Sequence, residues 1–177
     1  MLPLKIRADL NVNHGTRKLV LAAVEPEKPQ HLGLKLAAYL LFWDEELTVQ
    51  PSLNHHALTG QPFRPDLLGT DITGSVGIWV ECGNTSQNKI QKVLKRWSDA
   101  RVVVLKERPA EAERFRKVLE EGVPKSGRVE ILAWPEGEFK EWMRLLSEKT
   151  EIIGEAGGLT LNLVVNEEVY VADLKKF

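Results

Sequence analysis

The feature that most constrains the fold is a short apolar run that contains one carboxylate. Gly77-Ile-Trp-Val-Glu-Cys-Gly83 has the side chains of a strand that is buried on both faces. Glu81 lies inside this run, and a buried carboxylate is costly unless a cation or hydrogen-bond donors meet it. Asn84, Thr85 or Ser86 can then cap a basic helix. A strand with a buried carboxylate, a turn and a basic helix together are typical of an ion-binding site.

A strand pair and a core helix are predicted before this run. Residues 4–11 alternate apolar with polar side chains, and residues 17–24 form a second strand after a turn, so the two make a hairpin. Residues 30–43 are too densely apolar for a surface helix and indicate a helix in the core. A short strand at 47–49 and a strand over 61–68 complete this half of the chain.

The second half alternates strands with helices. The pattern predicts strands at 101–106 and 128–134, helices at 109–121 and 138–149, a loop at 154–158, and a closing hairpin of 159–165 with 169–174. We therefore expect one α/β domain over residues 1–177. Its central mixed β-sheet has helices on both faces, with peripheral β-hairpins.

The composition sets broad limits. With 177 residues, 43% of them hydrophobic, the chain can bury a sizeable core. Its net charge of -1 predicts no partner by itself. Cys82 is the one cysteine, which excludes an intrachain disulfide, and no apolar stretch is long enough to span a membrane. The chain begins without the apolar core of a signal peptide, so we expect a cytoplasmic protein without membrane partners.

A second carboxylate lies upstream of Glu81. Asp66 follows Pro65, and the turn-rich residues 69–75 predict that its strand pairs antiparallel with the Glu81 strand. The pairing would bring both carboxylates to one end of a sheet, where with the Cys82 carbonyl they could bind Mg²⁺ or Mn²⁺ through hard oxygen ligands. Asp71 is an alternative first acid, although its place in the turn favours a turn-forming role.

The helix after Gly83 carries a basic stripe. Lys89, Lys92 and Arg96 are spaced i, i+3 and i+7, so they lie on one side of the helix. Gln87 and Asn88 lie near its N-terminus, where a phosphate oxygen could be bound. The stripe predicts DNA or RNA as partner, against the alternative of an ordinary solvated helix face.

These residues resemble the signature of the PD-(D/E)xK nuclease superfamily, whose core is that of the restriction endonucleases. The match consists of Pro65-Asp66, a gap, and Glu81 two residues before Gly83. The resemblance implies that Asp66 and Glu81 bind Mg²⁺ and that a lysine activates water. Gly83 stands at the expected lysine position, so Lys89 or Lys92 on the following helix would take that role.

More of the chain resembles the YaeQ family, a variant of the same architecture. The resemblance rests on the first strand pair, the stretch His31–Leu47, Ile78-Trp-Val-Glu-Cys-Gly83, Lys89-Ile-Gln-Lys92 and the closing hairpin. Such sequences often carry an aspartate four residues before the glutamate, where this chain has Gly77. The first acid would therefore be Asp66 or Asp71.

Three functions are compatible with these features. The first is a metal-dependent nuclease with Asp66, Glu81 and Lys89 or Lys92 as catalytic residues. The second is a catalytically inactive nucleic-acid-binding protein on the same fold. The third is a regulatory or interaction protein that uses an apolar surface. Cleavage that stops with Glu81→Ala distinguishes the first, and salt-sensitive binding of nucleic acid separates the first two from the third.

Overall fold

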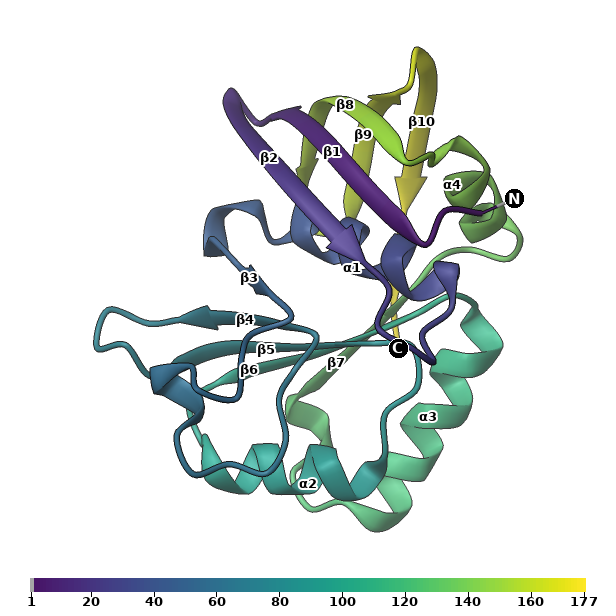
Figure 1. Ribbon diagram of the computed structural model, residues 1–177. Coiled ribbons are helices and arrows are strands. Elements are labelled where there is room, and N and C mark those ends of the chain that lie inside the picture. Colours follow the sequence, from purple (N-terminus) through teal and green to yellow (C-terminus); the bar gives the residue numbers. More distant parts are fainter. Residues whose placement is uncertain (1) are drawn as a thin grey trace.

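The chain forms two β-sheets with one helix between them (Figure 1). The computed structural model describes residues 2–177. The helix between the sheets is α1, Pro29–Leu41, and it is buried along its length from Leu32 to Leu41. Its side chains belong to one core cluster with residues of both sheets. This burial explains the density of apolar residues in the helix, because both of its sides need a nonpolar neighbour.

The first sheet, sheet A, combines the two ends of the chain. Its strand order is β10-β9-β8-β1-β2. The strands are β1 (Lys5–Val12), β2 (Gly15–Ala22), β8 (Lys149–Gly157), β9 (Thr160–Val165) and β10 (Glu168–Asp173). Strand β1 pairs antiparallel with β2 and parallel with β8. Every second residue of β1 is buried, from Ile6 to Val12, so one face of the sheet packs on the core and the other is open to solvent.

The second sheet, sheet B, has the order β11-β7-β6-β5-β4-β3. Its strands are β3 (Thr48–Val49), β4 (Leu67–Thr70), β5 (Val76–Cys82), β6 (Arg101–Lys106), β7 (Val129–Ala133) and β11 (Lys175–Lys176). Strands β5, β6 and β7 are parallel, and β4 pairs antiparallel with β5. Because parallel strands need crossovers, α2 (Gln87–Arg96) and α3 (Pro109–Gly122) connect them.

Helices cover both faces of sheet B. Helices α2 and α3 lie on the face away from α1, as Figure 1 shows, and enclose a second core with Trp79 and Phe115. The short helix α4, Glu138–Leu145, packs against α1 and β10. Its Trp142 donates from Nε1 to the Gly33 carbonyl of α1 at 2.9 Å. Within residues 2–177 no helix is long and apolar enough to cross a bilayer.

The predicted α/β class, mixed sheet and flanking helices are confirmed, with three corrections. The two hairpins are not peripheral, because β8 joins them into sheet A. Residues 154–158, expected to be a loop, lie mostly in β8, and the helix expected to reach residue 149 ends at Leu145. Asn13 fixes this strand, since its side chain bonds both main-chain groups of Ala156 at 2.7 and 2.9 Å.

Residues 2–177 also contain three short 3₁₀ helices. They are η1 (Trp43–Glu45), η2 (His56–Leu58) and η3 (Ser126–Arg128). The segment between α1 and β4, which contains η1 and η2, runs along the edge of sheet B beside α2 (Figure 1). This segment ends at Asp66 and therefore places that residue beside the end of β5.

Candidate functional site

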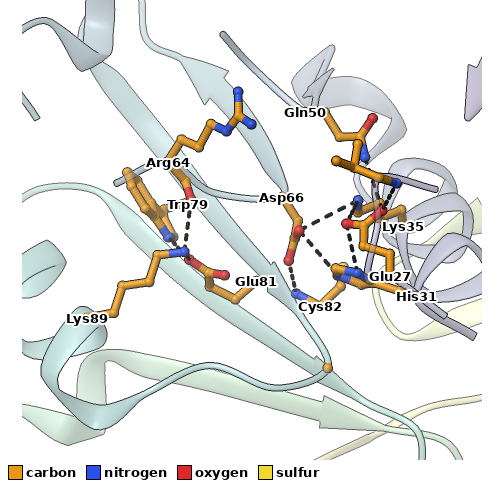
Figure 2. Close-up of polar contacts among 12 residues, drawn as sticks. Glu27, His31, Lys35, Gln50, Arg64, Asp66, Trp79, Glu81, Cys82 and Lys89 are labelled. Atoms are coloured by element: carbon orange, nitrogen blue, oxygen red, sulfur yellow. Dashed lines mark hydrogen bonds and ion pairs between the residues drawn. The ribbon is translucent and has the colours of Figure 1, made fainter. Parts of the chain in front are cut away.

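Two polar clusters lie side by side at the end of β5, and Figure 2 shows them. The Asp66 cluster contains Asp66 with three residues from α1 and the segment before it, Glu27, His31 and Lys35. The Glu81 cluster contains Glu81 with Trp79, Lys89 and the carbonyl of Arg64. Each cluster places a carboxylate among cationic groups.

Strand pairing sets Asp66 and Glu81 opposite each other. Leu67 of β4 pairs with Val80 of β5, so Asp66, one residue before β4, lies opposite Glu81 of β5. The Asp66 carboxylate contacts α1, whereas the Glu81 carboxylate contacts Trp79 and Lys89 of α2. The Asp66 N–H donates to the Val80 carbonyl at 3.1 Å. In return, the Cys82 N–H donates to Asp66 Oδ2 at 2.7 Å. The antiparallel pairing predicted from the turn-rich 69–75 segment is therefore confirmed.

Asp66 is held as a carboxylate. Its Oδ1 lies 3.2 Å from His31 Nε2 and 3.8 Å from Lys35 Nζ. Burial raises the pKa of Asp66, but His31, the Cys82 N–H and Lys35 together outweigh burial and hold the pKa below its ordinary value. The Asp66 carboxylate therefore stays ionised at neutral pH.

Glu27 contacts the same two residues, His31 and Lys35. Its Oε1 lies 2.6 Å from Lys35 Nζ and 3.0 Å from His31 Nδ1. Lys35 is fully buried, so its ammonium depends on these two carboxylates for its stability. His31 Nε2 is buried, and Asp66 Oδ1 at 3.2 Å is the polar atom that it approaches within residues 2–177.

Glu81 lies in a different environment. Only 3% of the residue is exposed, and its Oε1 accepts from Trp79 Nε1 at 2.8 Å and lies 2.6 Å from Lys89 Nζ. Burial is the largest cause that raises the pKa of Glu81; Lys89 opposes it and the charge of Asp66 adds to it. The pKa values of the two carboxylates are therefore shifted in opposite directions.

Lys106 is a buried cation that the sequence analysis did not single out. It ends β6 beside Gly83, and its Nζ donates to the Gly83 carbonyl at 2.6 Å. The ammonium also lies 4.5 Å from the centre of the Phe115 ring. Burial lowers the pKa of Lys106, while Glu111 and Glu81 oppose that shift. The turn that follows Glu81 is therefore anchored by a lysine from the neighbouring strand.

The three residues of the predicted basic stripe do not share one environment. Lys89 turns inward to Glu81, whereas Lys92 and Arg96 remain exposed on the helix. Arg96 lines a polar cavity of about 430 Å³ beside Trp97 and the β4–β5 turn. Asn88 is exposed at the N-terminal end of α2, and the Gln87 amide lies against Gly122 at the end of α3. Of the predicted lysines, the structure thus brings Lys89 alone to the carboxylates.

The alternative first acid does not reach this site. Asp71 is in the β4–β5 turn, where its Oδ1 accepts from the main-chain N–H groups of Thr73 and Ser75 at 2.8 and 3.0 Å. That turn is at the far end of β5 from Glu81. Gly77 leaves no room for an acidic side chain, because a Cβ there would lie 3.1 Å from the Asp71 nitrogen.

Glu27, His31 and Lys35 are site residues that the sequence did not predict. Lys35 carried a signal, since it is the one charged residue in the apolar run between residues 32 and 42. A lysine there implies a buried acid in the fold, and His31 lies one helical turn before it on the same side. Glu27 carried no comparable signal, because it precedes the helix in a charged loop.

A metal ion could be held in two ways. Glu27, His31 and Asp66 each offer a ligand atom, and these atoms lie within 4.8 Å of one another. Lys35 already contacts both carboxylates of that group and supplies the positive charge. In the second way Glu81 takes part, since its Oε2 accepts no hydrogen bond in the described part of the chain while Oε1 contacts Trp79 and Lys89.

Comparison with known proteins gives a family and a fold. The family profile for "YaeQ protein" matches residues 6–168. The structure is similar to that of YaeQ protein from Xanthomonas axonopodis pv. citri, with 17% identity, a TM-score of 0.74, and 98% of this chain and 97% of that chain covered. It is also similar to YaeQ protein from Pseudomonas syringae, with 16% identity, a TM-score of 0.72, and coverage of 98% and 94%. No curated protein matches the chain.

Proposed function

The chain belongs to the YaeQ family, and we propose that it hydrolyses phosphodiester bonds of nucleic acid with a divalent ion, Mg²⁺ or Mn²⁺. The observation that carries this proposal is the pair Asp66 and Glu81. Two carboxylates occupy neighbouring positions on paired strands, their pKa values are shifted apart, and Lys89 contacts the one with the raised pKa. Such divergent pairs are characteristic of acid–base sites.

The residues fit a hard divalent ion. Carboxylate and carbonyl oxygens are the ligands that Mg²⁺ and Mn²⁺ prefer, and Asp66, Glu81 and the Cys82 carbonyl would supply them. The raised pKa of Glu81 means that Lys89 does not fully offset its burial and the charge of Asp66. A further cation at this position is therefore electrostatically favourable. When bound, the ion lowers the pKa of a water ligand and neutralises charge on the phosphate.

The protein's own residues supply the remaining functions. Asp66 stays ionised because its pKa is lowered, so it is available as a ligand at neutral pH. Lys89 bridges Glu81 and the Arg64 carbonyl at 2.6 and 2.8 Å. The Lys89 ammonium, beside Glu81, would orient the attacking water or stabilise the charge on the phosphate. Lys92, Arg96 and Asn88 contact the flanking backbone.

A second function, binding of nucleic acid without cleavage, is favoured by one observation. Neither Asp66 nor Glu81 lines the cavities beside α2 and at the carboxyl ends of the parallel strands, and each carboxylate already has a lysine partner. A phosphate backbone could still follow the exposed cations of α2 and Arg64 by charge alone. Such binding weakens with salt and requires no metal.

Calorimetry with Mn²⁺ tests the proposed function. We expect wild type to bind Mn²⁺ and the conservative variants Asp66→Asn and Glu81→Gln to lose binding, because each removes one charged ligand. Asp71→Asn is the matched control, since it keeps the turn hydrogen bonds at the far end of β5 and should bind Mn²⁺ as wild type does. Cleavage of single- and double-stranded DNA and RNA is then measured with the same four proteins.

Two results would argue against a metal-dependent hydrolase. Wild-type protein that does not bind Mn²⁺ would exclude the two-carboxylate site. Salt-sensitive nucleic-acid binding without cleavage, weakened by Lys92→Gln and Arg96→Gln, would establish the second function instead.

A further inference from the structure

Two cavities that share lining residues, called here the polar part and the apolar part, lie at the carboxyl ends of the parallel strands of sheet B. A polar part of about 460 Å³ is lined by Gly83 after β5 and Glu107 after β6, together with His31 of α1. An apolar part of about 620 Å³ is lined by Phe139 and Met143 of α4. Volumes of this size are typical of small-molecule sites, and the carboxyl ends of parallel strands are where α/β sheets bind ligands.

Glu107 connects the two parts. It lines both of them, as does Gln30. The residue is half-buried, and burial, with the nearby charge of Glu111, raises the pKa of Glu107. No cation within residues 2–177 is within ion-pairing distance of Glu107, although Arg108 and Lys28 act on it from further away. A carboxylate at the junction of the two parts therefore has no partner of its own.

The cations around the apolar part are largely engaged elsewhere. Arg108 pairs with Glu111 at 2.7 Å. Arg144 pairs with Glu141 at 2.9 Å and with Glu168 at 2.8 Å. Lys140 is exposed at the rim, where solvent screens its charge. The half-buried Glu107 is thus the charge that a ligand inside the cavity would meet most directly.

We propose that the two parts together bind a small organic cation, namely a primary amine on an apolar chain. The ammonium group pairs with Glu107, and the chain lies in the apolar part against Phe139 and Met143. A bound ammonium would satisfy the half-buried carboxylate that the chain leaves unpaired, while the apolar surface contributes by burial. The proposal does not depend on phosphodiester hydrolysis: Asp66, Glu81 and Lys89 line neither part, although Cys82 and His31 line the polar part.

Calorimetry at pH 8 with three probes of equal chain length tests this proposal. We expect octylamine to bind, and 1-octanol and octanoate to bind about ten-fold more weakly or less, because hydrogen bonds to charged groups account for such factors. Glu107→Gln should weaken octylamine binding by about ten-fold and leave 1-octanol unchanged. Glu136→Gln is the matched control, since Glu136 is exposed at the rim of the apolar part and should have little effect.

Thermal unfolding of each variant verifies that it is folded. Glu107 makes no ion pair or hydrogen bond in the described structure, so its replacement should not lower the melting temperature. The proposal is overturned if no probe binds, if octanoate binds as tightly as octylamine, or if Glu107→Gln binds octylamine like wild type.

Discussion

Asp66 and Glu81 are neighbours across one strand pair, yet their protonation contributes to stability with opposite sign. The folded-state pKa of Asp66 is lowered, so ionised Asp66 stabilises the fold above its unfolded pKa, and that stability is lost as the pH falls. The folded-state pKa of Glu81 is raised, so protonated Glu81 is favoured in the fold, and that contribution is lost as the pH rises through its folded pKa.

Two isosteric variants should reveal this difference. Glu81→Gln is expected to be more stable than wild type at pH 8, with the gain shrinking toward pH 4, where Glu81 is protonated. Asp66→Asn is expected to be less stable at pH 8, with the loss shrinking as the pH falls through the folded pKa of Asp66. Urea unfolding of the three proteins at several pH values measures both trends. A Glu81→Gln protein that is less stable than wild type at pH 8 would mean that the ion pair with Lys89 outweighs the cost of burial.

At the scale of elements, local signals located most helices and strands. Ser86 caps α2, as its Oγ accepts from the Lys89 N–H, and Pro109 begins α3. The β8 strand was missed because Gly154 and Gly157 lie in it and resemble a loop locally. Its strand conformation comes from pairing with β1 and β9, and its link to β1 spans most of the chain.

Gly77 gives a test of the β4–β5 pair. Its Cβ position is crowded by the main chain of Thr70 and Asp71, at 3.3 and 3.1 Å, where the pairing register shifts. We expect Gly77→Ala to destabilise the protein by about 1–3 kcal/mol, because backbone cannot move aside as a side chain does. Gly157→Ala is the matched control: it is also in a strand, its Cβ would have no neighbour within 4 Å, and its stability should be unchanged or higher. Equal effects of the two variants in chemical denaturation would rule out the crowding at Gly77.

At the scale of the whole molecule, the packing of helix α1 explains why half of the candidate site could not be predicted. Glu81 was predicted because it is a carboxylate inside an apolar run, Asp66 because it follows Pro65 just upstream, and their pairing because of the turn between their strands. Glu27, His31 and Lys35 reach Asp66 because α1 crosses sheet B, and that packing is set by contacts between distant segments. Periodicity along the sequence contains no information on which strand a core helix will cross.

The shared helix also predicts cooperative unfolding. Leu36 is fully buried in the core that joins both sheets. Leu36→Ala should lower the free energy of unfolding by about 2–5 kcal/mol, as expected for a cavity in a packed core. Unfolding of this variant, followed by far-UV circular dichroism and by tryptophan fluorescence, should give the same midpoint in both signals, and that midpoint should be lower than in wild type. Separate midpoints for the two signals would show that the sheets unfold independently.

The central place of β1 in sheet A has a consequence for biosynthesis. One edge of β1 pairs with β2 directly after the first turn, but its other edge waits for β8, which a ribosome makes more than 130 residues later. Until then the nascent hairpin carries an unpaired strand edge and an apolar face with Ile6 and Leu10. Sheet A can close only after β8 has been made, so the newly made β1–β2 hairpin is exposed to wrong pairing until then and is a segment that a chaperone would protect.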